Sequence, residues 1–246
     1  MVSCKHWKNG HCKDCRKNCP IKKKLGQMAA KKAAQKQKVH KAAHKTVGKV
    51  ALAMQPAFPL VHDELQKHLV HGRRVQAWAL HLFAALRAVH GLAAPWEEIL
   101  GLAAYLHDIG WVRGQKKHHK HSQSMILENA VLPLASEIRP LVALVARYHR
   151  KAKPSLKHKA FAALGSAERN AVCVLASLLR IADALEYSHN AALAGITACV
   201  QGQGLVVTAE YTKDASAEVA RVHKKSALFT ALFGMPVQVH CAPRAC

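Results

Sequence analysis

Gly101-Leu-Ala-Ala-Tyr-Leu-His-Asp-Ile-Gly110 is the stretch of this 246-residue sequence that decides the fold. The stretch is rich in apolar residues, and Pro95 precedes it at a position where helices commonly begin. We therefore predict a helix from residue 95 to residue 108, ended by Gly110. The adjacent His107 and Asp108 then lie at the end of an apolar helix. Helix ends in a bundle bring side chains from several helices together, which makes them a usual place for metal sites.

Helical patterns continue on both sides of this stretch. Apolar residues recur at helical spacing over residues 61–90, and Gly91 is a plausible stop. Further helices are predicted over 121–132, 136–149 and 168–187, with a loop or short helix over 154–165. Alanine and leucine dominate the apolar residues and aromatic residues make up only 5% of the chain, which favours packed helices over a β-sandwich.

The pattern changes after Ser188. Residues 196–200 and 205–211 are rich in β-formers around a Gly202-Gln203-Gly204 turn, which predicts a hairpin, followed by a helix over 215–233 and a strand over 237–240. The predicted fold class is mainly α: a helical bundle over residues 55–190 with a small C-terminal α/β subdomain over 191–246. A basic, Cys-rich N-terminal extension precedes them.

The N-terminal extension carries a cluster of cysteines in residues 1–20, namely Cys4, Cys12, Cys15 and Cys19. Four thiolates suit zinc or an iron–sulfur cluster, and His6 or His11 is an alternative ligand. No secretory signal and no apolar run long enough to span a membrane is present, so we expect a cytoplasmic protein. Clustered cysteines there more often bind metal than form disulfides. The alternative is a reduced tail with no fixed ligand.

The net charge of +23 is concentrated in the same extension. Residues 1–50 carry a net charge of +14, and the remainder carries +9. A field of this sign attracts polyanions such as nucleic acid, polyphosphate or nucleotides. The lysine-rich residues 21–54 are predicted to be a tail or linker, either simply solvated or binding nucleic acid.

Four side chains from three predicted helices form the central constellation: His71, His107, Asp108 and Asp183. Mixed histidine and carboxylate ligation suits Mn, Fe, Mg, Zn or a similar divalent ion. Such an ion polarises a phosphoryl oxygen and activates water for attack, so this residue set suits phosphoester hydrolysis.

An ordered series of blocks resembles the C-terminal HD domain of the exopolyphosphatase/guanosine pentaphosphatase family. The blocks are His71-Gly-Arg-Arg-Val-Gln-Ala-Trp, Ala103-Ala-Tyr-Leu-His-Asp-Ile-Gly110, His118-His-Lys-His-Ser122, Arg147-Tyr-His-Arg-Lys151 and Leu178-Leu-Arg-Ile-Ala-Asp-Ala-Leu-Glu-Tyr-Ser-His189. The tail of the chain, with its hairpin and Lys224-Lys225, follows the same layout. The resemblance covers roughly residues 60–240, and Glu186 stands where the family commonly has Asp.

The resemblance implies roles for individual residues. His71, His107, Asp108 and Asp183 correspond to the metal ligands, with His107 and Asp108 catalytic, and His121 and His149 correspond to ligands of a second metal. Basic residues are candidates to hold phosphate oxygens: Lys120, Arg147, Arg150, Lys151 and Arg180. His118 and His119 are expected in a solvated loop.

The sequence thus predicts a metal-dependent phosphohydrolase acting on a nucleotide, a guanosine alarmone or polyphosphate through metal-activated water. Full-length members of the family carry an actin-like two-lobed region ahead of this domain, and that region is not recognisable here. We therefore expect any catalysis to come from the His/Asp centre. The alternative is a non-catalytic module that binds polyphosphate, RNA or a nucleotide. The oligomeric state stays open, with a dimer as one option.

Overall fold

The computed structural model describes residues 7–8, 11–12, 62–130 and 132–243. The chain divides into two compact units, Met1–Thr46 and Val47–Cys246. In the first unit, strand β1 (Trp7–Lys8) pairs antiparallel with β2 (His11–Cys12). Cys4, Cys15, Cys19 and the basic tail lie outside the described residues, so the metal site predicted at the N-terminal cysteines stays a prediction.

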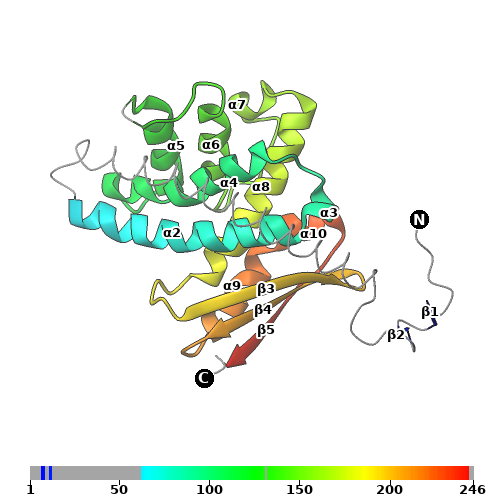
Figure 1. Ribbon diagram of the computed structural model, residues 1–246. Coiled ribbons are helices and arrows are strands. Elements are labelled where there is room, and N and C mark those ends of the chain that lie inside the picture. Colours follow the sequence, from blue (N-terminus) through cyan, green and yellow to red (C-terminus); the bar gives the residue numbers. More distant parts are fainter. Residues whose placement is uncertain (1–6, 9–10, 13–61, 131, 244–246) are drawn as a thin grey trace. The chain divides into compact units, whose positions relative to one another are not determined.

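The second unit is mainly helical, as the sequence predicts (Figure 1). Its helical part consists of α2 (His62–Ala85), α3 (Arg87–His90), α4 (Pro95–Leu106), the 3-10 helix η2 (Ile109–Arg113), α5 (His118–Glu128), α6 (Arg139–Arg147), α7 (Lys159–Ala162) and α8 (Ser166–Leu185). Gly91 ends α3 in the left-handed conformation that glycine adopts without steric cost, at φ 63°. No helix among the described residues is long and apolar enough to cross a bilayer.

The C-terminal part adds a three-stranded sheet of order β3-β4-β5. Strands β3 (Leu193–Gln201) and β4 (Gly204–Tyr211) form the predicted hairpin, and β5 (Val237–Pro243) lies parallel to β4. A parallel pair needs a crossover, which two helices supply, α9 (Ser216–Lys225) and α10 (Ala227–Phe233). The prediction of a single helix over 215–233 is therefore wrong in one respect: the helix is interrupted at Ser226, which separates α9 from α10.

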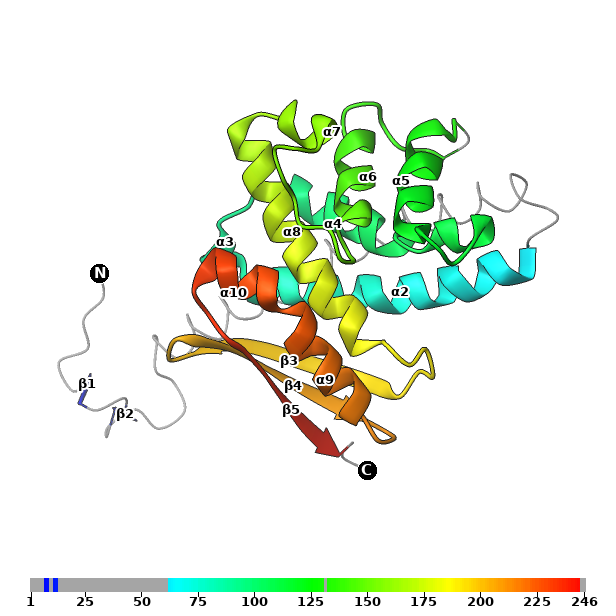
Figure 2. The same cartoon turned by 180° about the vertical axis from the view of Figure 1, so that it is seen from behind.

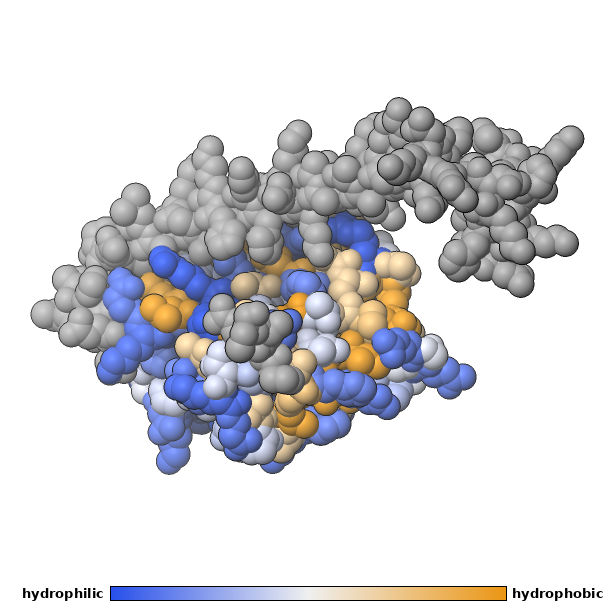
Figure 3. All heavy atoms as spheres, turned by 60° about the horizontal axis from the view of Figure 1, so that its bottom comes forward, coloured by the Kyte–Doolittle hydropathy of each residue, from blue (hydrophilic) through white to orange (hydrophobic). Residues whose placement is uncertain are grey.

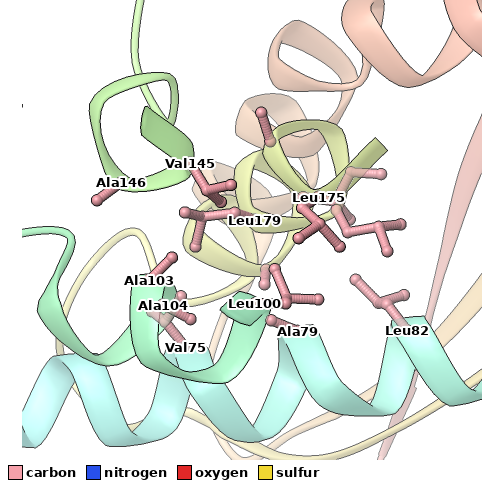
Figure 4. Packing of buried hydrophobic residues seen from close by; sticks show 14 of the residues in the cluster. Val75, Ala79, Leu82, Leu100, Ala103, Ala104, Val145, Ala146, Leu175 and Leu179 are labelled. Atoms are coloured by element: carbon pink, nitrogen blue, oxygen red, sulfur yellow. The ribbon is translucent and has the colours of Figure 1, made fainter. Parts of the chain in front are cut away.

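One apolar core runs through the helices and the sheet. Helices α2, α4, α6 and α8 meet around small and aliphatic side chains, among them Val75, Ala103 and Leu179 (Figure 4). The same cluster continues into β4 and α10 through Val207 and Phe229. Helices α9 and α10 cross the sheet on the side where they reach α8, and β3 runs beside α2 (Figure 2). Seen from the sheet side, hydrophobic and hydrophilic residues are interspersed on the described surface (Figure 3).

The backbones of α2 and α4 touch at Gly72, next to His71. A Cβ atom on Gly72 would lie 2.3 Å from the carbonyl oxygen of Tyr105, a distance that side-chain atoms do not occupy. The missing side chain therefore allows the close approach of the two helices. Because Tyr105 is two residues before His107, this contact also brings His71 close to His107.

Replacement of Gly72 by alanine is expected to destabilise the fold by about 1–3 kcal/mol, because two backbones must move apart. Gly101→Ala is the matched control: it also lies inside a helix, but the atom nearest to an added Cβ is Gln76 Nε2, a side-chain atom, at 3.3 Å and no backbone has to move. The control should stay within about 1 kcal/mol of the wild type. Urea unfolding of both variants measures the difference, and equal stabilities would contradict the packing argument.

Candidate metal centre

The predicted constellation is assembled where the C-terminal ends of α4 and α8 meet the middle of α2. His71 comes from α2, the His107-Asp108 pair follows α4, and Asp183 lies in the last turn of α8. Asp183 Oδ1 lies 3.6 Å from His71 Nε2 and 3.5 Å from His107 Nε2. His107 Nε2 is also 3.6 Å from Asp108 Oδ2. His71, His107 and Asp108 are buried, so one dry group of nitrogen and oxygen donors results.

A second group of donors shares Asp108. Its other carboxylate oxygen, Oδ1, lies 3.3 Å from His118 Nε2 and 3.5 Å from His149 Nε2. The two imidazoles stack, with their ring centroids 5.3 Å apart. In each group one possible ligand atom per residue lies within 4.8 Å of the others, a spacing that a single ion can bridge. Asp108 thus stands between two sets of histidines.

Three of these histidines are oriented in the same way. The Nδ1 atoms of His107, His149 and His118 lie 2.7, 2.7 and 3.2 Å from the carbonyl oxygens of Ala104, Ala146 and Gln115, three residues earlier in each case. A carbonyl only accepts hydrogen bonds, so the Nδ1 atoms of His107 and His149 carry a proton and their Nε2 atoms face Asp108; Nε2 can ligate a cation when it is unprotonated. His118 Nδ1 also lies 3.4 Å from the guanidinium of Arg150, which is a donor. Imidazoles held in this way are pre-oriented as metal ligands.

Gly110 explains how α5 reaches the site. A Cβ atom there would lie 2.2 Å from the carbonyl oxygen of His118 and 2.3 Å from the amide nitrogen of Ser122. The Gly110 amide donates to the Ser122 hydroxyl at 2.9 Å. Consequently α5 begins at His118, three residues earlier than predicted, and His118 is buried. The expectation of a solvated loop is wrong for His118, and His119 also lies in α5, where it is half-buried.

Charges at the centre are strongly coupled. Burial alone would raise the pKa of Asp108, but His107 and His149 outweigh it and lower this pKa to about 2. Burial opposes protonation of His107, yet Asp108 and Asp183 raise its pKa to about 9. Burial would also raise the pKa of Asp183, but Lys225, His107 and His71 outweigh this effect and hold the pKa well below its usual value. The carboxylates are therefore anionic at neutral pH, the form that binds cations.

The donor set fits a divalent cation. His71 Nδ1 and Nε2, His107 Nε2 and Asp108 Oδ1 are buried without a hydrogen-bond partner. Unsatisfied buried polar atoms are costly, and a cation that accepts lone pairs from one nitrogen of His71, from His107 Nε2 and from Asp108 Oδ1 removes much of that cost. Burial lowers the pKa of His149 well below its ordinary value, which keeps this imidazole in the neutral, ligating form.

A cavity of about 330 Å³ opens onto the centre, and cations surround it. Its lining includes Asp108, His149 and Asp183 together with Arg150, Arg221 and Lys225. Lys225 Nζ donates to Asp183 Oδ2 at 3.0 Å and to the His149 carbonyl at 2.9 Å. Helix α9 of the C-terminal part thus completes a site that the helical part begins.

The residues predicted to hold phosphate lie in different places. Arg150 lines the cavity, whereas Lys151 is exposed beside it. Arg180 is buried and donates to the backbone carbonyls of Tyr148, Arg150 and Ala152, so it braces the loop that carries His149 instead of facing the cavity. Lys120 and Arg147 are not among the residues that line the cavity. His121, predicted as a ligand with His149, is not in either donor group of the described residues.

Several residues of the site were not predicted from the sequence. They are His118, Lys225, Arg221, Trp111, Tyr187 and His189. The His189 ring stacks on His71 with centroids 3.8 Å apart, and the Trp111 ring stacks on His118 at 4.8 Å. For Lys225 a sequence signal exists, because it is three residues after the apolar Val222 on a predicted helix and so shares its inward face.

The sequence matches a known protein family. Residues 60–227, more than half of the chain, match the family Ppx/GppA phosphatase, domain III. No curated protein matches the sequence. The matched segment contains both donor groups and Lys225, so the site described above lies within the family's own region. The chain is therefore a member of the Ppx/GppA phosphatase family, and it carries domain III of that family.

Proposed function

We propose that this protein is an HD-type, metal-dependent phosphohydrolase. The observation that carries the proposal is the position of Asp108, whose two oxygens face two separate sets of buried imidazoles at 3.3–3.6 Å. A carboxylate in that position is the natural bridge between two cations. Membership in a family of phosphatases supports hydrolysis as the reaction class.

The ligands follow from the two donor groups. His71, His107, Asp108 and Asp183 would hold one divalent ion, and Asp108, His118 and His149 a second. Their mixture of imidazole and carboxylate donors suits Mn, Fe or a similar ion, and Mg less well, because Mg prefers oxygen ligands. When bound, such ions supply Lewis acidity toward a phosphoryl oxygen and lower the pKa of water.

The protein's own side chains account for substrate binding. Arg150, Arg221 and Lys225 line the cavity beside the donor groups, so they can neutralise oxygens of a phosphoryl group placed there. The Arg221 guanidinium packs over the Tyr187 ring, with Cζ 4.3 Å from its centroid, and its Nε is buried without a hydrogen-bond partner. Arg221 Nε is thus a donor held in place without an acceptor, and an oxygen of a bound phosphate group would accept its hydrogen bond.

Asp108 and His107 are assigned as ligands rather than as proton acceptors. The low pKa of Asp108, about 2, makes this carboxylate a weak base but a permanent anion at neutral pH. Its Oδ1 atom lies 3.3 Å from His118 Nε2 and 3.5 Å from His149 Nε2, and Lys225 Nζ pairs with Asp183 at 3.0 Å. The substrate class we propose is a nucleotide, guanosine alarmone or inorganic polyphosphate.

The test is metal-dependent turnover by the full chain. Protein freed of metal by chelation should release phosphate from tripolyphosphate or p-nitrophenyl phosphate only after Mn²⁺ or Fe²⁺ is restored. Persistent absence of phosphate release with every metal, together with retained binding of tripolyphosphate, would contradict the hydrolase. That outcome would leave the alternative, a non-catalytic polyanion-binding module, which the excess of cations around the cavity also favours.

Arg221→Gln is expected to raise KM for a phosphorylated substrate about tenfold, because one charge-assisted hydrogen bond to phosphate is lost. Metal content should not change, since Arg221 is in neither donor group. Arg113→Gln removes the same charge from an exposed arginine outside the cavity and is the control. Steady-state kinetics distinguishes the two variants, and an unchanged KM for Arg221→Gln would refute its role.

A further inference from the structure

A second, strongly basic cavity adjoins the metal cavity. It encloses about 390 Å³ and is lined by Gln115, Lys116, Lys117, His119, Arg150 and Lys151. Gln115 and Arg150 line the metal cavity as well. The two cavities are therefore neighbours that share two side chains, and a ligand longer than one phosphate group can reach from one to the other.

The lining of this second cavity carries only positive and neutral groups. Lys116, Lys117, Arg150 and Lys151 supply four cations and no carboxylate is present. Among the described residues, none of these four cations has a carboxylate oxygen within 4.0 Å. Burial and then His118, Arg147 and Arg150 lower the pKa of His119 to about 4. Unpaired cations concentrated in a hollow produce a field that attracts anions.

The walls of the cavity are fixed relative to the metal ligands. Lys117 adopts a left-handed conformation, φ 63°, directly before His118, and its carbonyl accepts from the Lys120 amide at 2.7 Å. A non-glycine residue in this conformation is strained and is often found at functional sites. Two other lining residues, Arg150 and Lys151, directly follow His149, and Arg180 donates to the carbonyl oxygens of Tyr148 and Ala152 at 2.7 and 2.6 Å.

We propose that this cavity is a second anion subsite, which holds a phosphate group of the substrate beyond the one that is attacked at the metal centre. The proposal rests on the proposed function and narrows its substrate to molecules with a chain of phosphates. Apart from His119, the lining offers no ring and no apolar side chain against which a nucleobase would pack. The subsite therefore recognises phosphates, whether they belong to an inorganic chain or to a nucleotide.

The test compares two charge-matched double variants of the full chain. Lys117→Gln/Lys151→Gln removes two cations from the cavity, and Lys153→Gln/Lys157→Gln removes two exposed cations that do not line it. With tripolyphosphate as substrate, the first variant should raise KM about tenfold relative to the second, with kcat unchanged. With p-nitrophenyl phosphate, which has a single phosphate, both variants should match the wild type. An equal KM for tripolyphosphate in both variants would overturn the subsite.

Two further arms keep the result interpretable. ATP tested beside tripolyphosphate shows whether the bound phosphates belong to a nucleotide or to an inorganic chain. An equal rise in KM for both substrates assigns the subsite to any phosphate chain. A rise for tripolyphosphate alone assigns it to inorganic chains. If the wild type turns over no substrate, the proposed function fails, and calorimetric titration with tripolyphosphate still tests the subsite through the same pair of variants. Equal affinities would then overturn it. Should Lys117→Gln/Lys151→Gln fail to fold, Lys116→Gln/Lys151→Gln replaces it and leaves Lys117 in place.

Discussion

Replacement of Asp108 by alanine is expected to remove both metal ions and to lower phosphate release by about three orders of magnitude or more. Asp108 Oδ1 is 3.3 Å from His118 Nε2, and Oδ2 is 3.6 Å from His107 Nε2, so one carboxylate serves both donor groups. Without it, each group loses its shared anion and keeps mainly neutral donors. Replacement of Asp183, which faces the two histidines of the first donor group and pairs with Lys225, should cost one ion and spare the other.

Metal content per chain, measured beside phosphate release, checks this expectation. Asp214→Ala is the matched control, because Asp214 is an exposed aspartate that accepts hydrogen bonds from residues next to it in sequence, among them the amide and hydroxyl of Ser216. Circular dichroism shows whether each variant is folded. Metal at the N-terminal cysteines, if present, is common to the wild type and all three variants and cancels in the comparison. Two ions retained by Asp108→Ala would show that this carboxylate does not bridge them.

The first donor group could be predicted from the sequence because its members lie in strongly patterned helices. His71 and Asp183 are embedded in long amphipathic or apolar segments, and His107-Asp108 ends another. Regular spacing therefore placed each side chain at a helix end or on an inward face. The mainly helical fold and the C-terminal hairpin follow from the same local patterns.

His118 could not be predicted in this way. Residues 116–121 read Lys-Lys-His-His-Lys-His, with no apolar residue to mark an inward face, so the helix was expected to start later. The burial of His118 depends on the backbone contact between Gly110 and α5, which is a tertiary interaction and leaves no local signal. In a sequence pattern His118 and His119 are equivalent, and only the fold shows that His118 is the one that faces Asp108.

Long-range contacts also connect the predicted C-terminal subdomain to the site. Lys225 lies beyond the boundary predicted near residue 190, yet it bonds to Asp183. Glu186, where the family commonly has Asp, is buried and accepts from Arg74 Nε at 2.6 Å and from Trp78 Nε1 at 3.3 Å. Arg74 also donates to the Leu193 carbonyl at the start of β3. The division at residue 190 stays a prediction, and these bonds link both sides of it.

The pair His118→Ala and His121→Ala separates the sequence-based assignment of the second metal from the structural one. His118 Nε2 lies 3.3 Å from Asp108 Oδ1 and 3.3 Å from His149 Nε2, whereas His121, one turn later on α5, is half-buried and in neither donor group. His118→Ala should therefore reduce the metal content from two ions to one and lower kcat about 100-fold, because only one cation remains to stabilise the transferred phosphoryl group.

His121→Ala, which removes the same side chain from the same helix, should keep two ions and a kcat within about threefold of the wild type, because surface substitutions away from a site have small effects. Metal analysis and single-turnover kinetics on both variants give the answer. The reverse pattern, with metal lost only from His121→Ala, would restore the ligand set implied by the family resemblance. It would require α5 to be rotated about its axis relative to this structure, in which the contact at Gly110 holds His118 against Asp108.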